Sequence, residues 1–184
     1  MKRLTALAWL CLLPALAQSA APQPPSIVGR SWMVGDLSSG QVLGAERPDE
    51  RVEPASLTKL MTAYVVFQAL RDKKISLEQQ VNASERAWRA PGSRMFVQPR
   101  KPVSVDELIR GVVVQSGNDA CIALAEAVAG TEEAFVQAMN REAARFGLKS
   151  TKFMNATGLP DPQHYSTAQD LHLLAAALIR DHPT

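Results

Sequence analysis

The alternation of apolar and polar residues along the chain predicts one hairpin followed by a series of helices. Residues 29–34 and 41–45 are mostly apolar and flank the turn sequence at 36–40, which favours two antiparallel strands. The larger apolar residues of 56–70 cover more than one face of a helix, so we expect this helix to be buried on several sides. Further helices are predicted at 104–109 or beyond, 119–129, 131–146 and 167–180, between irregular stretches at 82–103 and 155–165.

Capping residues mark several ends of these helices. Ser104 and Glu107 have the spacing of a capping box, in which each residue binds the backbone N–H of the other. Thr167 is expected to cap the last helix. Gly130 and Gly147 are expected to end the helices that precede them.

The predicted elements are unbalanced, because two strands stand against at least five helices. A lone hairpin is marginal in water, and a stable sheet needs three or more strands or a covering helix. The apolar helices need a larger sheet to pack on. We therefore expect the chain to stop before its fold is complete.

Composition places the chain among globular proteins of one domain. Its 184 residues are 46% hydrophobic and 21% charged, which excludes a wholly disordered or collagen-like protein. Lys2 and Arg3 are the only charged residues among the first 21, so residues 22–184 carry 18 basic and 18 acidic side chains. A neutral domain without a long basic run gives no reason to expect nucleic-acid binding.

Residues 1–21 have the pattern of a secretory signal peptide. The positive charges of Lys2 and Arg3 precede an apolar stretch too short to span a bilayer, and small residues allow cleavage after Ala17 or Ala21. We therefore expect export across the inner membrane to the periplasm; the alternative is an N-terminal membrane anchor. Removal of Cys11 would leave Cys121 alone, as a small core residue without a disulfide partner.

The sequence Ser56-Leu57-Thr58-Lys59 carries the first chemical signal. Residues three apart share a helix face, so the Ser56 hydroxyl lies beside the Lys59 amine, at a helix end whose free N–H groups favour negative charge. A lysine in a first turn opposes the helix dipole, and with burial its pKa falls, which yields a neutral base. The alternative is a solvated lysine one turn from a capping serine.

The sequence Ser116-Gly117-Asn118 carries the second signal. The Ser116 hydroxyl is suited to relay a proton, and the Asn118 amide is suited to bind a peptide carbonyl and to hold the lysine. The alternative is that Ser116 or Asn118 simply caps the helix that follows. The two interpretations are compatible.

The two motifs together are much more specific, because S-x-x-K, a second serine–asparagine motif and K-T-G are typical of class A β-lactamases and penicillin-binding proteins. From about Ser26 to its end, the chain resembles the low-molecular-mass penicillin-binding proteins that are D-alanyl-D-alanine carboxypeptidases, serine peptidases of family S11. The matching text is PASLTKLMTAYVVF, MFVQPRKPVSVDELIRGVVVQSGNDACIALAEAVAG and KFMNATGLPDPQHYSTAQDLHLLAAALIRDHP. This resemblance implies an α+β fold of the β-lactamase/DD-peptidase type, an antiparallel sheet flanked by helices with an all-helical lobe.

The same resemblance implies the roles of the site residues. Ser56 is implied to be the nucleophile, Lys59 its base, Ser116 a second proton-handling hydroxyl and Asn118 a ligand of the substrate's backbone carbonyl. His164 resembles a position near the family's cleft, although a histidine in a loop is more often solvated. No metal or organic cofactor is implied. The implied reaction is hydrolysis of the terminal D-alanine from a peptidoglycan stem peptide ending in D-Ala-D-Ala, with β-lactams as inhibitors.

The chain departs from the family in lacking K-T-G, since Lys149 and Lys152 are followed by other residues. In the family this motif lies on a later strand, so residues 22–184 are expected to be an incomplete catalytic domain, with membrane association only through a segment beyond residue 184. Three alternatives remain open: a β-lactamase, a D,D-endopeptidase, or an inactive truncated fragment that binds the cell wall.

Other kinds of site are weaker. A G-x-S-x-G elbow and an H-E-x-x-H motif are absent from the sequence, and the spacing of the three histidines does not favour a metal site. The arginines between 86 and 100 are suited either to attract the carboxylates of cell-wall peptides or to lie on a solvated loop.

Overall fold

The computed structural model describes residues 26–183, so the predicted signal peptide lies outside the described part. Along the chain the elements are β1 (Trp32–Gly35), β2 (Val42–Glu46), the 3-10 helix η1 (Ala55–Thr58), α1 (Lys59–Arg71), β3 (Gln80–Val81), α2 (Glu85–Trp88), β4 (Val103–Ser104), α3 (Val105–Gln115), α4 (Asn118–Ala129), α5 (Glu132–Arg145) and α6 (Ala168–Asp181).

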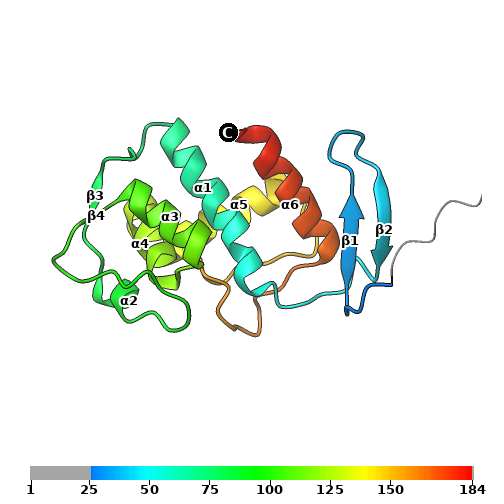
Figure 1. Cartoon of the computed structure of the whole chain (residues 1–184), viewed down its shortest axis with the longest axis horizontal. Helices are drawn as coiled ribbons and strands as arrows, with labels where there is room; N and C mark the ends of the chain where they lie inside the picture. Colours follow the sequence, from blue (N-terminus) through cyan, green and yellow to red (C-terminus); the bar gives the residue numbers. More distant parts are fainter. Residues whose placement is uncertain (1–25, 184) are drawn as a thin grey trace, which may run out of the picture.

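Helix α1 is the centre of the molecule. It contacts α3, α4 and α5 in a helical lobe, and it contacts α6 on its other side (Figure 1). Helix α6 in turn lies against β1, so the hairpin sits at the end of the molecule opposite the lobe. The first residues of α1 lie beside the loops that follow α2 and α5, and these loops build the site described below.

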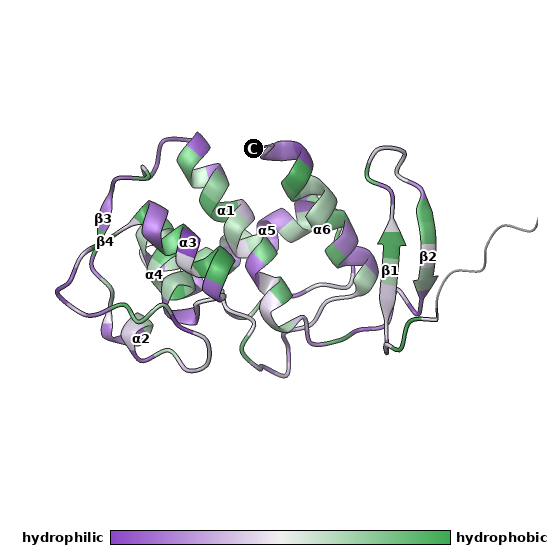
Figure 2. Ribbon diagram, viewed as in Figure 1, coloured by the Kyte–Doolittle hydropathy of each residue, from purple (hydrophilic) through white to green (hydrophobic). Residues whose placement is uncertain are grey.

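The sequence of α1 explains its central position. Met61, Tyr64 and Val66 point in different directions around the helix and are each at most 1% exposed. They pack in one core with Phe135 and Met139 of α5. Burial of such a side chain contributes about 1.5–3 kcal/mol. The prediction of a helix buried on several sides is confirmed, and Figure 2 shows apolar residues, in green, along α1 and the lobe helices around it.

The predicted caps are confirmed. The Ser104 hydroxyl accepts from the backbone N–H of Glu107, whose carboxylate accepts from the N–H of Ser104. Thr131 and Thr167 cap α5 and α6 through their hydroxyls, and Gly130 ends α4 at a φ of 82°. Helix α3 continues to Gln115, well beyond the predicted minimum, because Val112 stays on its buried face.

The stretch 82–103 is less irregular than predicted. It contains α2, which Ser84 caps, and its last residue pairs through β4 with β3 in a second two-stranded sheet. Hydrophobic periodicity could not predict these elements, because each has only two to four residues and a period needs a longer stretch to be recognised.

The predicted hairpin is confirmed, with strands shifted by up to three residues. Trp32 pairs with Glu46 and Val34 with Gly44 in antiparallel register. Helix α6 approaches so closely that a Cβ built on Gly35 would lie 2.4 Å from the His172 ring. The hairpin nevertheless leaves apolar side chains exposed at Val34, Val42 and Leu43, visible as green strands in Figure 2.

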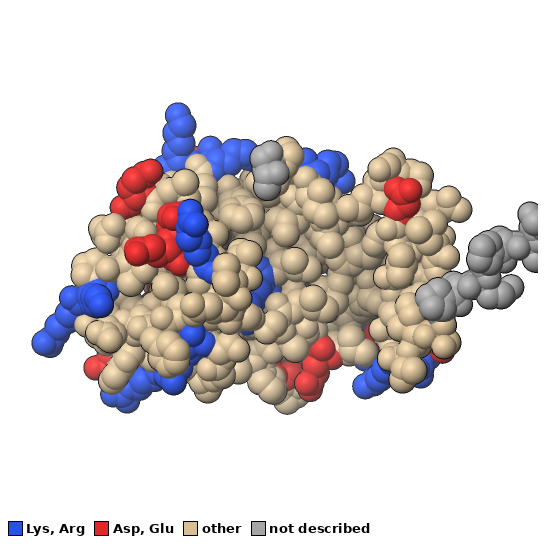
Figure 3. Space-filling view, in the orientation of Figure 1, with Lys and Arg blue, Asp and Glu red and all other residues tan. Residues whose placement is uncertain are grey.

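The surface carries charges of both signs, interspersed on the face shown in Figure 3. Within residues 26–183, none of the helices has the length and apolar character needed to cross a membrane.

Gly158, in the loop after α5, lies at a φ of +86°, and a Cβ built there would be 1.8 Å from the carbonyl oxygen of Ala55. Gly158→Ala is expected to lower the free energy of unfolding by about 2–5 kcal/mol, from left-handed strain of about 1–2 kcal/mol plus a steric displacement of about 1–3 kcal/mol. Urea denaturation followed by circular dichroism measures the loss.

The matched control is Gly147→Ala, because Gly147 has a φ of +71° and open space around it. This variant is expected to lose only the strain, about 1–2 kcal/mol. Equal losses in the two variants would show that the contact with Ala55 does not constrain the loop.

Candidate active site

The site is built on the turn that begins the central helix. Ala55 has a φ of 45°, and the chain then forms η1 before α1 starts at Lys59. The sequence placed Ser56 in a first α-helical turn; the structure places it in a 3-10 turn, where residues three apart are eclipsed. The Lys59 amine Nζ consequently lies 3.3 Å from the Oγ of Ser56, whose residue is exposed to solvent.

Lys59 is buried, and its amine is held by acceptors from two other segments. Nζ donates to the Oδ1 of Asn118 at 2.8 Å and to the backbone carbonyl of Thr157 at 2.7 Å. Its described partners include no carboxylate. In the neutral form of the amine, the two short hydrogen bonds use both of its protons and leave its lone pair free to accept from the Ser56 hydroxyl.

The electrostatic setting favours that neutral form. Burial lowers the pKa of Lys59, because the charged amine loses its hydration. A Cys121 thiolate would raise the pKa of Lys59, but burial raises the pKa of this thiol to about 12, so it stays neutral and supplies no counter-ion. Lys59 is 7% exposed, so the interpretation of a solvated lysine is wrong.

Asn118 is fixed by its backbone and by both ends of its amide. While Oδ1 faces Lys59, Nδ2 donates to the carbonyl of Pro91 at 2.7 Å, and the backbone N–H donates to the carbonyl of Ser93 at 2.7 Å. The expectation that Asn118 holds the lysine is met. The alternative that Ser116 or Asn118 caps α4 is wrong, because Gly117 is the N-cap and no side chain binds there.

Ser116 ends α3 in the left-handed region, with φ 55° and ψ 35°. This conformation turns the chain sharply from α3 into α4 and brings Asn118 to Lys59. The Ser116 side chain is half-buried, and its hydroxyl makes no hydrogen bond to a described residue. The structure thus brings together Ser56, Lys59 and Asn118, with Ser116 at the adjoining bend.

His164 is a departure from the sequence prediction. The sequence favoured a solvated loop histidine, but the side chain is 3% exposed, and its Nε2 lies 2.9 Å from the hydroxyl of Thr58. Burial lowers its pKa, so the ring is held neutral. His164 therefore anchors the loop after α5 to the turn that carries Ser56.

Two groups of the site could not be identified from the sequence. The Thr157 ligand of Lys59 is a backbone carbonyl, which every residue possesses, so no motif identifies it. Thr58 lies inside S-x-x-K at a position where the motif allows any residue, and only its partner shows its use.

Two of the four arginines between residues 86 and 100 form ion pairs within the chain. Arg86 pairs with Glu132 and Glu133, and Arg89 pairs with Glu85. The interpretation that these two arginines attract substrate carboxylates is thereby weakened.

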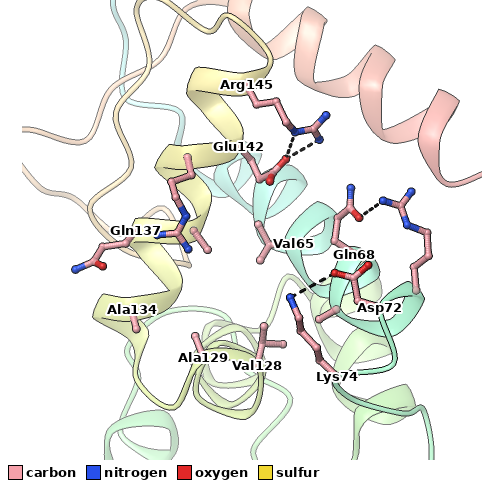
Figure 4. A pocket seen from close by; sticks show the side chains of 14 residues that line it. Val65, Gln68, Asp72, Lys74, Val128, Ala129, Ala134, Gln137, Glu142 and Arg145 are labelled. Atoms are coloured by element: carbon pink, nitrogen blue, oxygen red, sulfur yellow. Dashed lines mark hydrogen bonds and ion pairs between the residues drawn. The ribbon is translucent and has the colours of Figure 1, made fainter.

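The described part of the chain also has a groove away from these residues. A cavity of about 640 Å³ lies between the C-terminal half of α1, the end of α4 and α5, with Val65 and Ala129 facing it and ion pairs at its rim (Figure 4). Ser56, Lys59 and Asn118 do not line it. The groove is therefore separate from the candidate active site.

Comparison with known proteins agrees with this geometry. The family model described as D-alanyl-D-alanine carboxypeptidase, Peptidase_S11, matches residues 18–184. The chain is 46% identical over 175 residues to D-alanyl-D-alanine carboxypeptidase DacC of Escherichia coli (strain K12), covering 92% of this chain and 44% of that protein. It is 42% identical over 194 residues to DacA of Haemophilus influenzae, covering 100% of this chain and 49% of that protein.

Solved structures of penicillin-binding proteins are also similar to this chain. Penicillin-binding protein 5 from Haemophilus influenzae superimposes with a TM-score of 0.85 at 44% identity, over 89% of this chain and 48% of that one. Penicillin-binding protein 6B from Escherichia coli superimposes with a TM-score of 0.83 at 41% identity, over 90% of this chain and 54% of that one.

The chain spans about half the length of the curated relatives it matches. Its described part has the fold of the corresponding part of penicillin-binding DD-peptidases, as the resemblance implied. On both grounds, the chain belongs to the S11 family of D-alanyl-D-alanine carboxypeptidases.

Proposed function

We propose that the protein is a serine-type D-Ala-D-Ala carboxypeptidase that removes the terminal D-alanine from peptidoglycan stem peptides through an acyl-enzyme. The observation that carries the proposal is the Lys59 amine, buried without a described counter-ion and 3.3 Å from the exposed Ser56. Burial of this kind lowers the pKa of an amine and so favours the neutral form that acts as a base, and a serine beside such a base is a nucleophile.

In the proposed acylation, the Ser56 Oγ bonds to the carbonyl carbon of the penultimate D-alanine while its proton passes to Lys59. The bond to the terminal D-alanine breaks, and Lys59 passes the proton through the Ser116 hydroxyl to the departing nitrogen, which leaves Lys59 neutral again. Asn118 has little freedom to rotate because Lys59 and Pro91 hold both ends of its amide, so its remaining hydrogen-bonding capacity points in a fixed direction toward a substrate carbonyl.

In the proposed deacylation, water attacks the ester carbonyl and gives a proton to Lys59. The bond between the carbonyl carbon and the Ser56 Oγ then breaks, and Lys59 returns the proton to Oγ, so the acid leaves and Ser56 is restored. The backbone N–H of Ser56 donates to no described group, and it supplies one hydrogen bond to the negative oxygen of each tetrahedral intermediate. A K-T-G strand outside this sequence would supply a second donor and a grip on the terminal carboxylate, with residues 22–184 forming the part of the catalytic domain that carries the nucleophile.

β-Lactams are proposed to acylate the same serine. Penicillin-binding protein D2 from Listeria monocytogenes, 29% identical with a TM-score of 0.78, has been solved in ampicillin-bound and cefotaxime-bound forms. Export to the periplasm, where stem peptides are exposed, is proposed from the pattern of residues 1–21.

A second candidate is cleavage of peptide cross-links. The D-alanyl-D-alanine endopeptidase of Pseudomonas aeruginosa is 35% identical over 179 residues and matches over 92% of this chain. The two activities differ in the group beyond the scissile bond. Release of free D-alanine from a pentapeptide supports the carboxypeptidase, whereas conversion of cross-linked muropeptides to monomers supports the endopeptidase.

The test of the nucleophile is Ser56→Ala. The assay uses an extended protein, in which this chain is followed by the part of E. coli DacC that lies beyond the matched region. The parent is expected to be labelled covalently by a fluorescent penicillin and to release D-alanine from a stem pentapeptide. Ser56→Ala is expected to lose both, because no oxygen remains to form the ester.

The control is Ser38→Ala in the hairpin turn, which removes a hydroxyl far along the chain from the site and should retain labelling. Labelling of Ser56→Ala at the parent's level would refute the assignment. Labelling without D-alanine release, followed by rapid return of free enzyme, would identify a β-lactamase.

The base should be visible in the pH dependence of acylation. Because only the neutral amine accepts the proton, the acylation rate should rise as pH increases through the pKa of Lys59. Burial lowers that pKa, so the midpoint is expected below the 10.5 of an ordinary lysine. Stopped-flow acylation measured across a range of pH gives the midpoint. A midpoint at the ordinary value would contradict a desolvated base.

A further inference from the structure

We propose that Asp119 is a positioning residue, whose buried carboxylate holds residues 91–97 against Asn118 and thereby keeps the Asn118 amide on Lys59. The proposal rests on the proposed function for the importance of Lys59. Its physical core is a set of hydrogen bonds that joins α4 to an irregular segment.

The Asp119 side chain is completely buried, and its described partners are all backbone N–H groups. Oδ1 accepts from Met95 at 2.9 Å, and Oδ2 accepts from Phe96 at 2.7 Å and Val97 at 3.0 Å. Oδ1 also accepts from its neighbour Ala120 at 2.9 Å. A buried carboxylate is costly unless it is fully hydrogen-bonded, so its three partners in the segment are held strongly.

The segment needs this support because its backbone is strained. Phe96 has a φ of 67°, although it is not a glycine, and its side chain is 69% exposed, with the Arg94 guanidinium 5.0 Å from the centre of its ring. A bulky residue adopts a positive φ only where its surroundings impose it. The N–H groups of Phe96 and of the residues on either side of it all bind Asp119, so the carboxylate imposes this conformation.

The other end of the same segment holds Asn118. The carbonyl of Pro91 accepts from the Asn118 side chain and the carbonyl of Ser93 accepts from its backbone, each at 2.7 Å. If Asp119 releases residues 95–97, the two carbonyls lose their fixed position. The Asn118 amide can then rotate away from Lys59, and water can reach the amine.

Asp170 provides a matched control. It is also a buried acid in the first turn of a helix, α6, and it accepts from the Ser150 N–H at 2.8 Å and the Thr151 hydroxyl at 2.7 Å. Its partners do not contact Ser56, Lys59 or Asn118. Loss of either carboxylate should cost stability, but only loss of Asp119 should change the active site.

The experiment compares Asp119→Asn with Asp170→Asn in the extended protein. In Asp119→Asn the new NH₂ group must face an N–H donor, because both oxygens of Asp119 accept hydrogen bonds. Asp170 accepts both of its described bonds through Oδ2, so Asp170→Asn removes the charge of a buried acid while its remaining oxygen can keep these two bonds.

The first readout is the pKa of the Lys59 amine by NMR, which does not depend on catalysis. The groups facing this amine are the Ser56 hydroxyl, the Thr157 carbonyl, Asn118 and the neutral Cys121 thiol. The substitution also removes the negative charge of Asp119, which by itself would lower the pKa of the amine, so a rise in that pKa reports the entry of water.

We expect both variants to melt at a lower temperature than the parent. In Asp119→Asn alone, the pKa of Lys59 should rise toward its ordinary value. At a temperature well below both melting transitions, its acylation by a fluorescent penicillin should slow tenfold or more, and the rising limb of the pH profile should move to higher pH. Phe96→Gly in the Asp119→Asn background should recover part of the rate, because glycine needs no support at a positive φ.

An unchanged pKa of Lys59 in Asp119→Asn, or an equal change in Asp170→Asn, would overturn the proposal. If Asp119→Asn does not fold, Asp119→Glu is compared with Asp170→Glu. Both of these variants keep the negative charge, but the extra methylene group displaces the carboxylate oxygens from their hydrogen-bond donors. If the parent is not labelled, the proposed function fails, while the NMR measurement still decides the role of Asp119.

Discussion

The site depends on an amine that is buried without a described anion to balance it. Lys59 begins the central helix, its Oδ1 ligand comes from the first residue of α4, and its carbonyl ligand comes from the loop after α5. Both ligands are neutral oxygens, so they satisfy the N–H groups of a neutral amine without stabilising an ammonium as a carboxylate would. The helical lobe therefore has a chemical task beyond stability: it brings two polar oxygens, and no charge, to one buried nitrogen.

The loops that carry these oxygens are irregular but firmly held, each by a buried polar side chain. Glu132 is 4% exposed and accepts from the Ala156 N–H at 2.9 Å, next to the carbonyl that binds Lys59. Asp119 does the same for residues 95–97. Because irregular backbone cannot satisfy its own N–H groups, a buried carboxylate both satisfies them and fixes their position. Each carboxylate stands in the first turn of a helix, α5 or α4, where the helix dipole offsets part of its charge.

The parts of the structure that follow local rules could be predicted from the sequence. The caps at Ser104 and Thr167 and the proximity of Ser56 to Lys59 depend on spacings of three residues, which a helix fixes. The structure of the Ser116–Asn118 bend could not be predicted in this way, because Ser116 takes a left-handed conformation that its own residue type does not demand. The burial of His164 was also missed. It results from contact with Thr58, more than a hundred residues earlier, and no periodicity reports such a contact.

The described residues provide more of the groups needed to remove the proton from Ser56 than of those needed to stabilise the tetrahedral oxygen. Proton removal from Ser56 requires a neutral amine at hydrogen-bonding distance, and the described residues supply three hydrogen-bonding partners of that amine. Stabilisation of the tetrahedral oxygen is served only by the Ser56 N–H, and the absence of one donor of this kind typically costs about 10²–10³ in rate. The relatives are about twice as long as the matched region. Under the proposed function, a division in which the lobe and α1 prepare the nucleophile, while sheet strands elsewhere bind the developing charge, accounts for the exposure of Ser56 beside a buried amine.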